Sequence, residues 1–313
     1  MAKKKSVQAA DYIAPLYING MQGRMLHMPA RGRKKLEILY VYGHHSSLER
    51  WWGMIELLNQ YGSVTAPDLP GFGGMDSLYK IGEKPTLDTM ADYLAAFIKL
   101  RYKRKRIVIV GLSYGFVVAT RMLQRYPQLA KKCDMVVSIV GFTHHSEFTF
   151  SRPRMLAYRA LCKLSTTTPV SIFYKNVLLH PTVIRLGYAK TYNAKKKFAA
   201  VAQKDKKQAM DFEVHLWRCN DIRTHAQTNY DFLKLNNLGK RVKLPLWHVE
   251  VKNDNYFDHY TVVEHLRTIY DDVNVCTAKT EVHAPSVIAS KKDVKPFVPR
   301  ALQQAFRDLA KKQ

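Results

Sequence analysis

Apolar runs alternate with amphipathic stretches along most of this chain. Residues 36–42, 106–110 and 134–140 are almost continuously apolar, which is typical of strands that are covered on both faces of a parallel sheet. The stretches between them place apolar residues at helical spacing, as in residues 86–102, which start at Thr86, a good N-cap residue. Strands that alternate with helices in this way predict an α/β fold with a mostly parallel central sheet and helices on both faces.

The same pattern predicts the individual elements. A hairpin is expected first, from residues 14–19 and 25–28 around Gly20 and Gly23. Further strands are expected at residues 36–42, 63–67, 106–110, 134–140, 244–251 and 273–277, and helices at 49–61, 86–102, 116–126, 258–270 and 298–311.

The alternation stops between the fourth and fifth of these strands. Residues 142–241 are helical in composition, basic, and rich in Tyr and His, and they contain no strong strand pattern. Because strands resume afterwards, we interpret this stretch as an insertion into one domain. Residues 1–141 and 242–313 then form the α/β core, and 142–241 form an inserted helical cap.

Composition limits the class of protein. No apolar run approaches 18 residues, and the mean hydropathy of −0.27 argues against a membrane span. The first residues are basic but no apolar segment follows, so no secretory signal is predicted and we expect a cytoplasmic protein. Four cysteines lie far apart without a CxxC pair, which predicts free thiols rather than a zinc knuckle or a disulfide framework.

The net charge of +25 is concentrated in the insertion. Residues 151–240 contain 17 Lys/Arg, including Lys195, Lys196 and Lys197, and five Asp/Glu, a net charge of +12. This excess is either an ordinary solvated basic surface or a weak attraction for nucleic acid or an anionic membrane.

One short motif carries candidate chemistry. Gly111-Leu112-Ser113-Tyr114-Gly115 follows an apolar strand and precedes an apolar helix, which is the context that a nucleophile elbow requires. The flanking glycines are needed where strand and helix approach closely, and the turn exposes the serine hydroxyl beside the first helical N–H groups. Ser113 is therefore the predicted nucleophile.

A serine nucleophile needs a base and a group that orients the base. His283 follows the last predicted strand, which would place it at the same edge of the sheet as Ser113. Asp254 follows the preceding strand and is the favoured acid. Asp258, four residues on, is the alternative but is equally suited to be a helix N-cap, and Glu250 lies inside the strand and fits less well.

These motifs resemble those of the capped α/β-hydrolases, the branch with carboxylesterases, lipases and carbon–carbon bond hydrolases. The resemblance covers about residues 34–142 and 242–312. The motifs that carry it are Tyr42-Gly43-His44-His45, Asp68-Leu69-Pro70-Gly71-Phe72-Gly73, Gly111-Leu112-Ser113-Tyr114-Gly115, residues 245–254, and His283-Ala284-Pro285.

The resemblance implies a site as well as a fold. It implies an oxyanion hole formed by the backbone N–H groups of His44 and Tyr114, and it makes the insertion a lid over the pocket. Epoxide hydrolases and haloalkane dehalogenases share the scaffold but use an aspartate nucleophile, so Ser113 argues against both. Two positions depart from the family: Tyr42 replaces a frequent histidine, and Val251 stands where glycine is usual before the acid loop.

We therefore expect a serine hydrolase that cleaves a carboxylic ester, for instance that of an acyl lipid, without a cofactor. One alternative is cleavage of a carbon–carbon or amide bond on the same scaffold. Another is a basic binding protein with a vestigial hydrolase pocket. The adjacent pairs His44-His45 and His144-His145 are poor chelates, because neighbouring residues on a strand or helix point in different directions, so no metal is expected.

Overall fold

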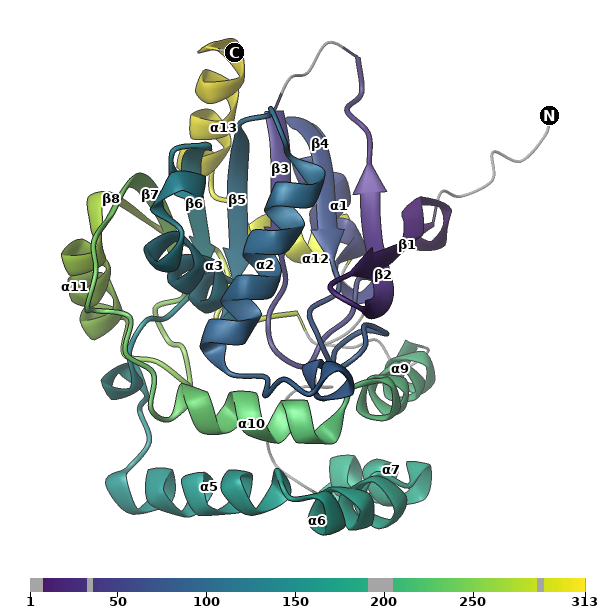
Figure 1. The fold of residues 1–313 in the computed structure, drawn as a ribbon. Helices are drawn as coiled ribbons and strands as arrows, with labels where there is room; N and C mark the ends of the chain where they lie inside the picture. The colour runs from purple at the N-terminus through teal and green to yellow at the C-terminus, as the bar shows by residue number, and fades with distance from the viewer. Residues whose placement is uncertain (1–7, 33–35, 191–204, 286–289, 313) are drawn as a thin grey trace.

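The computed structural model describes residues 8–32, 36–190, 205–285 and 290–312, and its centre is one eight-stranded sheet (Figure 1). The strand order is β1-β2-β4-β3-β5-β6-β7-β8. β1 and β2 form the antiparallel hairpin expected from the sequence, β2 pairs antiparallel with β4, and all later pairs are parallel. The strands are β1 (Ile13–Ile18), β2 (Met21–Met28), β3 (Leu36–Val41), β4 (Gly62–Pro67), β5 (Ile107–Leu112), β6 (Cys133–Ile139), β7 (Val242–Glu250) and β8 (Tyr270–Thr277).

Helices cover both faces of this sheet, as the continuous apolar strands predict (Figure 1). α2 and α3 pack together on one face, and α1 and α12 pack together on the other. The helices of the core are α1 (Trp52–Leu58), α2 (Leu87–Arg101), α3 (Tyr114–Arg125), α4 (Pro127–Ala130), α11 (His259–Ile269), α12 (Lys291–Val294) and α13 (Arg300–Lys312), with 3-10 turns at η1 (Ala9–Tyr12), η2 (Glu49–Trp51), η3 (Leu78–Ile81), η4 (His145–Glu147) and η7 (Lys295–Phe297).

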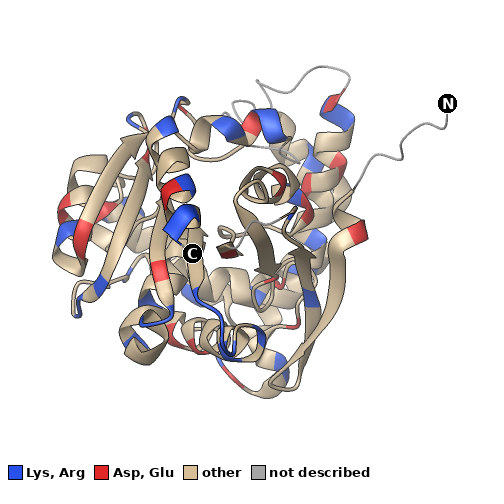
Figure 2. Ribbon diagram, turned by 90° about the horizontal axis from the view of Figure 1, so that it is seen from above, with Lys and Arg blue, Asp and Glu red and all other residues tan. Residues whose placement is uncertain are grey.

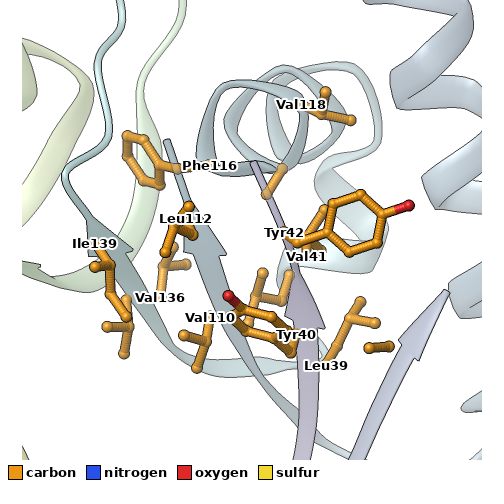
Figure 3. Close-up of a cluster of buried hydrophobic side chains, with 14 of the residues drawn as sticks. Leu39, Tyr40, Val41, Tyr42, Val110, Leu112, Phe116, Val118, Val136 and Ile139 are labelled. Atoms are coloured by element: carbon orange, nitrogen blue, oxygen red, sulfur yellow. The ribbon is translucent and has the colours of Figure 1, made fainter. Parts of the chain in front are cut away.

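The hydrophobic core lies between the sheet and these helices. Side chains of β3, β5 and β6, such as Val41, Leu112 and Ile139, are buried beside Phe116 and Val118 of α3 (Figure 3). Their burial fixes the carboxyl ends of the three central strands relative to the start of α3. The predicted fold class, a mostly parallel α/β sheet, is therefore confirmed.

One predicted helix is wrong in its extent. Residues 49–61 form a 3-10 turn, η2, followed by the short helix α1, which ends at Leu58 rather than at Tyr61. The next strand already begins at Gly62, where a Cβ atom would lie 2.0 Å from the carbonyl oxygen of Leu36. The chain must therefore leave the helix early to bring a glycine alongside β3.

The described helices between β6 and β7 lie outside the sheet (Figure 1). α10 lies along the lower edge of the sheet, and α5, α6 and α7 lie beyond α10. Leu179, Ile184, Val214 and Ile222 form a small hydrophobic cluster within this segment. Its elements are α5 (Arg152–Ser165), α6 (Thr168–Phe173), the π-helical turn η5 (Tyr174–Leu178), α7 (Pro181–Lys190), α9 (Lys206–Cys219) and α10 (Ile222–Phe232). The basic run of Lys195, Lys196 and Lys197 is outside the described residues.

Within the described ranges, no helix combines the length and the apolar character needed to cross a bilayer. Cys133, Cys162, Cys219 and Cys276 are all free thiols, as expected from their spacing.

Candidate active site

Ser113 occupies a strained turn between β5 and α3. Its backbone has φ 47° and ψ −116°, a conformation that residues other than glycine rarely adopt. A Cβ atom on Gly111 would lie 2.5 Å from the Cα of Phe116, and one on Gly115 would lie 2.1 Å from the carbonyl oxygen of Val41. Both flanking glycines are therefore required sterically, and Ser113 itself is partly exposed.

His283 approaches Ser113 from a loop that follows β8. Its Nε2 lies 3.1 Å from the Ser113 Oγ, and its Nδ1 lies 2.5 Å from an Asp254 carboxylate oxygen. With the proton on Nδ1, the imidazole donates to Asp254 and its Nε2 can accept the serine proton. The ring packs beside Tyr256 and Phe257, at centroid distances of 5.3 and 5.5 Å.

Asp254, rather than Asp258, faces this histidine. Asp254 Oδ2 contacts His283, and Asp254 Oδ1 accepts a 2.8 Å hydrogen bond from the Tyr256 N–H. Asp258 is the N-cap of α11 and accepts from the N–H and hydroxyl of Thr261, at 3.1 and 2.5 Å. The Glu250 carboxylate accepts from Thr277, at 3.0 Å. Of the three acidic candidates, only Asp254 is in contact with His283.

Two backbone N–H groups border Ser113. Tyr114 is the first residue of α3, so its N–H has no acceptor within the helix. A Cβ on Gly43 would lie 3.4 Å from the Ser113 Cβ, which places the His44 loop directly beside the serine. Neither the His44 N–H nor the Tyr114 N–H has a hydrogen-bond acceptor among the described residues. Both remain available to a bound oxygen.

The side chain of His44 lies against α10 and takes no part in the proposed reaction. Its Nε2 lies 2.7 Å from the Thr228 hydroxyl, and its ring is 4.6 Å from the ring of His225. Burial, and to a smaller extent the neighbouring His225, holds the pKa of His44 well below its usual range. The imidazole is therefore neutral and serves to hold the loop that carries the His44 N–H.

Further hydrogen bonds join α10 and the residues before it to the core loops. Asn220 accepts from the Gly73 N–H at 2.8 Å, and its amide nitrogen lies 3.1 Å from His45 Nδ1. The Asp221 N–H donates to the Gly71 carbonyl at 2.8 Å. The Leu87 N–H, at the start of α2, donates to Asp231 at 3.1 Å. These residues were not among those predicted from the sequence to belong to the site. A polar stripe at Asn220, Thr224 and Thr228 was the signal that could have indicated them.

Tyr42, which departs from the family pattern, links two loops near the site by hydrogen bonds. Its hydroxyl donates to Asp68 at 2.7 Å and accepts from the Leu69 N–H at 3.0 Å. The Arg24 guanidinium donates to the other Asp68 oxygen at 2.9 Å. Burial raises the pKa of Asp68 to about 7, against the opposing effect of Arg24. The tyrosine thus joins the loop after β3 to the loop after β4.

Across the ranges that the structure describes, no group of three or more His, Cys, Asp or Glu side chains is arranged to hold a metal ion. His144 and His145, in the loop after β6 where η4 begins, are engaged elsewhere: His144 packs beside His265, and His145 Nδ1 lies 3.0 Å from the Leu235 carbonyl oxygen.

Comparisons with known proteins agree with this architecture. The model of a family described as "alpha/beta hydrolase fold" matches residues 38–160. Protein ABHD8 of Bos taurus is 32% identical over 100 residues, which are 32% of this chain and 23% of that protein, so the match spans less than a quarter of the relative.

Two solved structures illustrate the similarity over the whole chain. A thermophilic esterase from Thermogutta terrifontis is 15% identical, with a TM-score of 0.62, covering 96% of this chain and 98% of the esterase. A mutant of an epoxide hydrolase from Bacillus megaterium is 13% identical, with a TM-score of 0.63, covering 94% of this chain and 100% of that one. At such identities the similarity concerns the path of the chain and does not select a reaction.

Proposed function

This chain has the α/β-hydrolase fold, and on that premise we propose that it is a serine hydrolase that cleaves a carboxylic ester. The observation that carries the proposal is the hydrogen-bonded sequence from Ser113 Oγ to His283 Nε2, at 3.1 Å, and from His283 Nδ1 to Asp254, at 2.5 Å. The three residues come from three different loops at one edge of the sheet. The local structure of the three loops does not require these side chains to be in contact, whereas nucleophilic catalysis does require it.

The proposed reaction proceeds through an acyl-enzyme. Ser113 Oγ attacks the ester carbonyl while His283 Nε2 takes its proton, and Asp254 stabilises the imidazolium that forms. The N–H groups of His44 and Tyr114 donate to the oxyanion of the tetrahedral intermediate. His283 then gives the proton to the leaving alcohol. Water, activated by the same histidine, attacks the acyl-enzyme and releases the acid and the free Ser113 hydroxyl.

The inserted helices have a place in this proposal as a lid. Residues 142–241 would cover the site, because α10 contacts the His44 loop through Thr228 and His225. Phe232, at the end of α10, packs against Tyr114 at a centroid distance of 4.8 Å and supplies an apolar neighbour for a bound acyl group. The substrate class that fits is a small ester or an acyl compound.

A fluorophosphonate probe tests the nucleophile directly. We expect labelling of the unmodified protein at Ser113 and none of Ser113→Ala or His283→Ala, with turnover of either variant lower by about 10⁶-fold. Circular dichroism of the three proteins controls for folding. Equal labelling of the unmodified protein and Ser113→Ala would refute the proposal.

A panel of p-nitrophenyl esters of increasing chain length tests which type of bond the protein cleaves. Turnover of at least one ester, lost in Ser113→Ala, supports ester hydrolysis. Labelling at Ser113 without turnover of any ester favours cleavage of an amide or a carbon–carbon bond, because the triad is common to all three reactions.

A further inference from the structure

The outer layer of the insertion exposes an unusual amount of apolar surface. In the described residues, 17 large apolar side chains are exposed, and ten of them lie between Leu156 and Leu186. Such concentration on one layer is uncommon for a surface that meets only water. The ten are Leu156, Tyr158, Leu161, Leu164, Ile172, Phe173, Val177, Leu178, Val183 and Leu186; we call them the outer apolar face.

The helix α5 shows which way this face points. One side of α5 packs against α10, where Arg159 donates to the Leu233 carbonyl and Arg223 donates to the Thr166 carbonyl. Leu161 and Leu164 lie on the opposite side of α5 and are 53% and 55% exposed. The apolar side of the helix therefore faces away from the protein, and α6 and α7 extend the same layer (Figure 1).

All the Lys, Arg, Asp and Glu residues in this layer are positively charged ones. Residues 151–190 contain seven Lys/Arg and no Asp or Glu. Arg152, Lys163 and Lys175 are exposed, so the outer apolar face is bordered by cations. At the other end of the molecule, by contrast, Asp and Glu are interspersed with Lys and Arg (Figure 2).

We propose that the layer of α5, α6 and α7 docks onto an anionic lipid bilayer, with the outer apolar face at the level of the headgroups. Exposed leucine and aromatic side chains bordered by lysine and arginine are the features of helices that lie in the membrane interface. Each cation adds attraction to acidic headgroups.

Two other occupants fit less well. A second copy of the chain would bring two surfaces of the same strong positive charge together, which opposes association. A nucleic acid would be bound by the cations but would leave the outer apolar face in water, because phosphates offer apolar side chains no partner.

This docking is independent of the proposed reaction, although it has a consequence for it. α5 packs on α10, and α10 contacts the loop that carries the His44 N–H. A bilayer on the outer apolar face would thus be separated from α10 by one helix layer, and from the Ser113 region by that layer and α10. Acyl lipids would then be the substrates within reach.

Sedimentation of the full-length chain with vesicles tests the proposal. We expect binding to vesicles of phosphatidylcholine and phosphatidylserine at about 3:1, and much weaker binding to phosphatidylcholine alone. Leu161→Gln/Leu164→Gln should lower the affinity for the anionic vesicles at least about tenfold. Arg152→Gln/Lys163→Gln/Lys175→Gln should lower it roughly 100-fold, at the usual attraction per cation near an anionic surface.

Matched variants control for substitution as such. Leu100→Gln replaces a leucine that is 51% exposed in the last turn of α2, about 20 Å from the end of that helix that contacts α10. Lys291→Gln/Lys292→Gln/Lys295→Gln removes three exposed cations outside the layer. Both controls, and Ser113→Ala, should sediment as the unmodified protein does, so loss of catalysis and loss of docking are separable.

Several results would overturn the inference. Failure of the unmodified chain to bind the anionic vesicles would do so, as would binding that is insensitive to both the leucine and the charge variants. A dimer in analytical ultracentrifugation that Leu161→Gln/Leu164→Gln dissociates, without any vesicle binding, would assign the outer apolar face to a second copy of the chain instead. A monomer that binds the vesicles supports the proposal.

Discussion

Replacing Asp254 by asparagine is the sharpest test of how His283 is held. The carboxylate uses both oxygens: Oδ1 accepts from the Tyr256 N–H at 2.8 Å, and Oδ2 contacts His283 Nδ1 at 2.5 Å. In Asp254→Asn the Tyr256 N–H still needs an acceptor, so the amide oxygen takes the Oδ1 position and the NH₂ group faces His283. The side chain is only 7% exposed, which leaves little room for water to compensate.

The consequence is a change of tautomer. An NH₂ donor next to Nδ1 favours the imidazole that carries its proton on Nε2, and this form cannot accept the proton of Ser113. The corresponding change in a protease triad lowers kcat by about 10⁴-fold, which corresponds to about 5.5 kcal/mol of lost transition-state stabilisation. We expect a loss of this order in Asp254→Asn.

Asp258→Ala is the matched control. Asp258 caps α11 through Thr261, so its loss should cost about 1 kcal/mol of unfolding free energy and leave kcat within about twofold of the unmodified protein. The assays are kcat for the best p-nitrophenyl ester, the rate of fluorophosphonate labelling, and urea unfolding. A loss below tenfold in Asp254→Asn, or an equal loss in Asp258→Ala, would refute the assignment of Asp254 as the acid.

Three other predictions concern stability. Ser113→Gly should be about 1 kcal/mol more stable to urea than Ser113→Ala, because glycine tolerates the φ of 47°; equal stability would contradict the strain. Tyr42→Phe should lower the unfolding free energy by about 2 kcal/mol and slow probe labelling, because an Asp68 oxygen and the Leu69 N–H lose their partner; an unchanged urea midpoint would count against it. Burial lowers the pKa of His225 from 6.5 to about 4, so stability that is present above pH 6.5 is lost as the pH falls toward 4. Between pH 7 and pH 5 the unmodified protein should therefore lose about 2 kcal/mol more than His225→Gln, and parallel losses in urea unfolding would show that His225 is not responsible.

Much of the fold could be predicted from the sequence, because the central strands are buried on both faces. The residues of β3 and β5 show this burial as nearly continuous apolar runs, interrupted in β3 by Glu37, and short runs of this kind are characteristic of the inner strands of a parallel sheet. The turn at Ser113 could be predicted because its steric requirements are local, and Gly111 and Gly115 meet them within the motif. His283 and Asp254 could be placed at the correct edge from strand order alone. Their catalytic role remains a prediction.

The contacts of the insertion could not be predicted in the same way. Thr228 and Asn220 act on His44 and His45 across more than 170 residues, and no local pattern specifies where a helix will lie on a sheet edge. Likewise, Tyr42 departs from the family pattern in sequence, and only its contact with Asp68 explains why a tyrosine suits that position. The early end of α1 depended on the approach of Gly62 to β3, which is also a tertiary effect.

The attachment of α10 to the loops after β3 and β4 divides the insertion into two parts with different freedom to change. Substitutions in α10 would disturb the backbone beside Ser113, so the sequence of this helix is constrained by the geometry that the proposed reaction needs. Among the described residues, α5 and α6 pack on α10 and α7 packs on α9, so these outer helices lie one layer further from the His44 loop and are less constrained. Under the proposed reaction and docking, exchange of the outer helices would therefore move the same active site to a different surface without altering it.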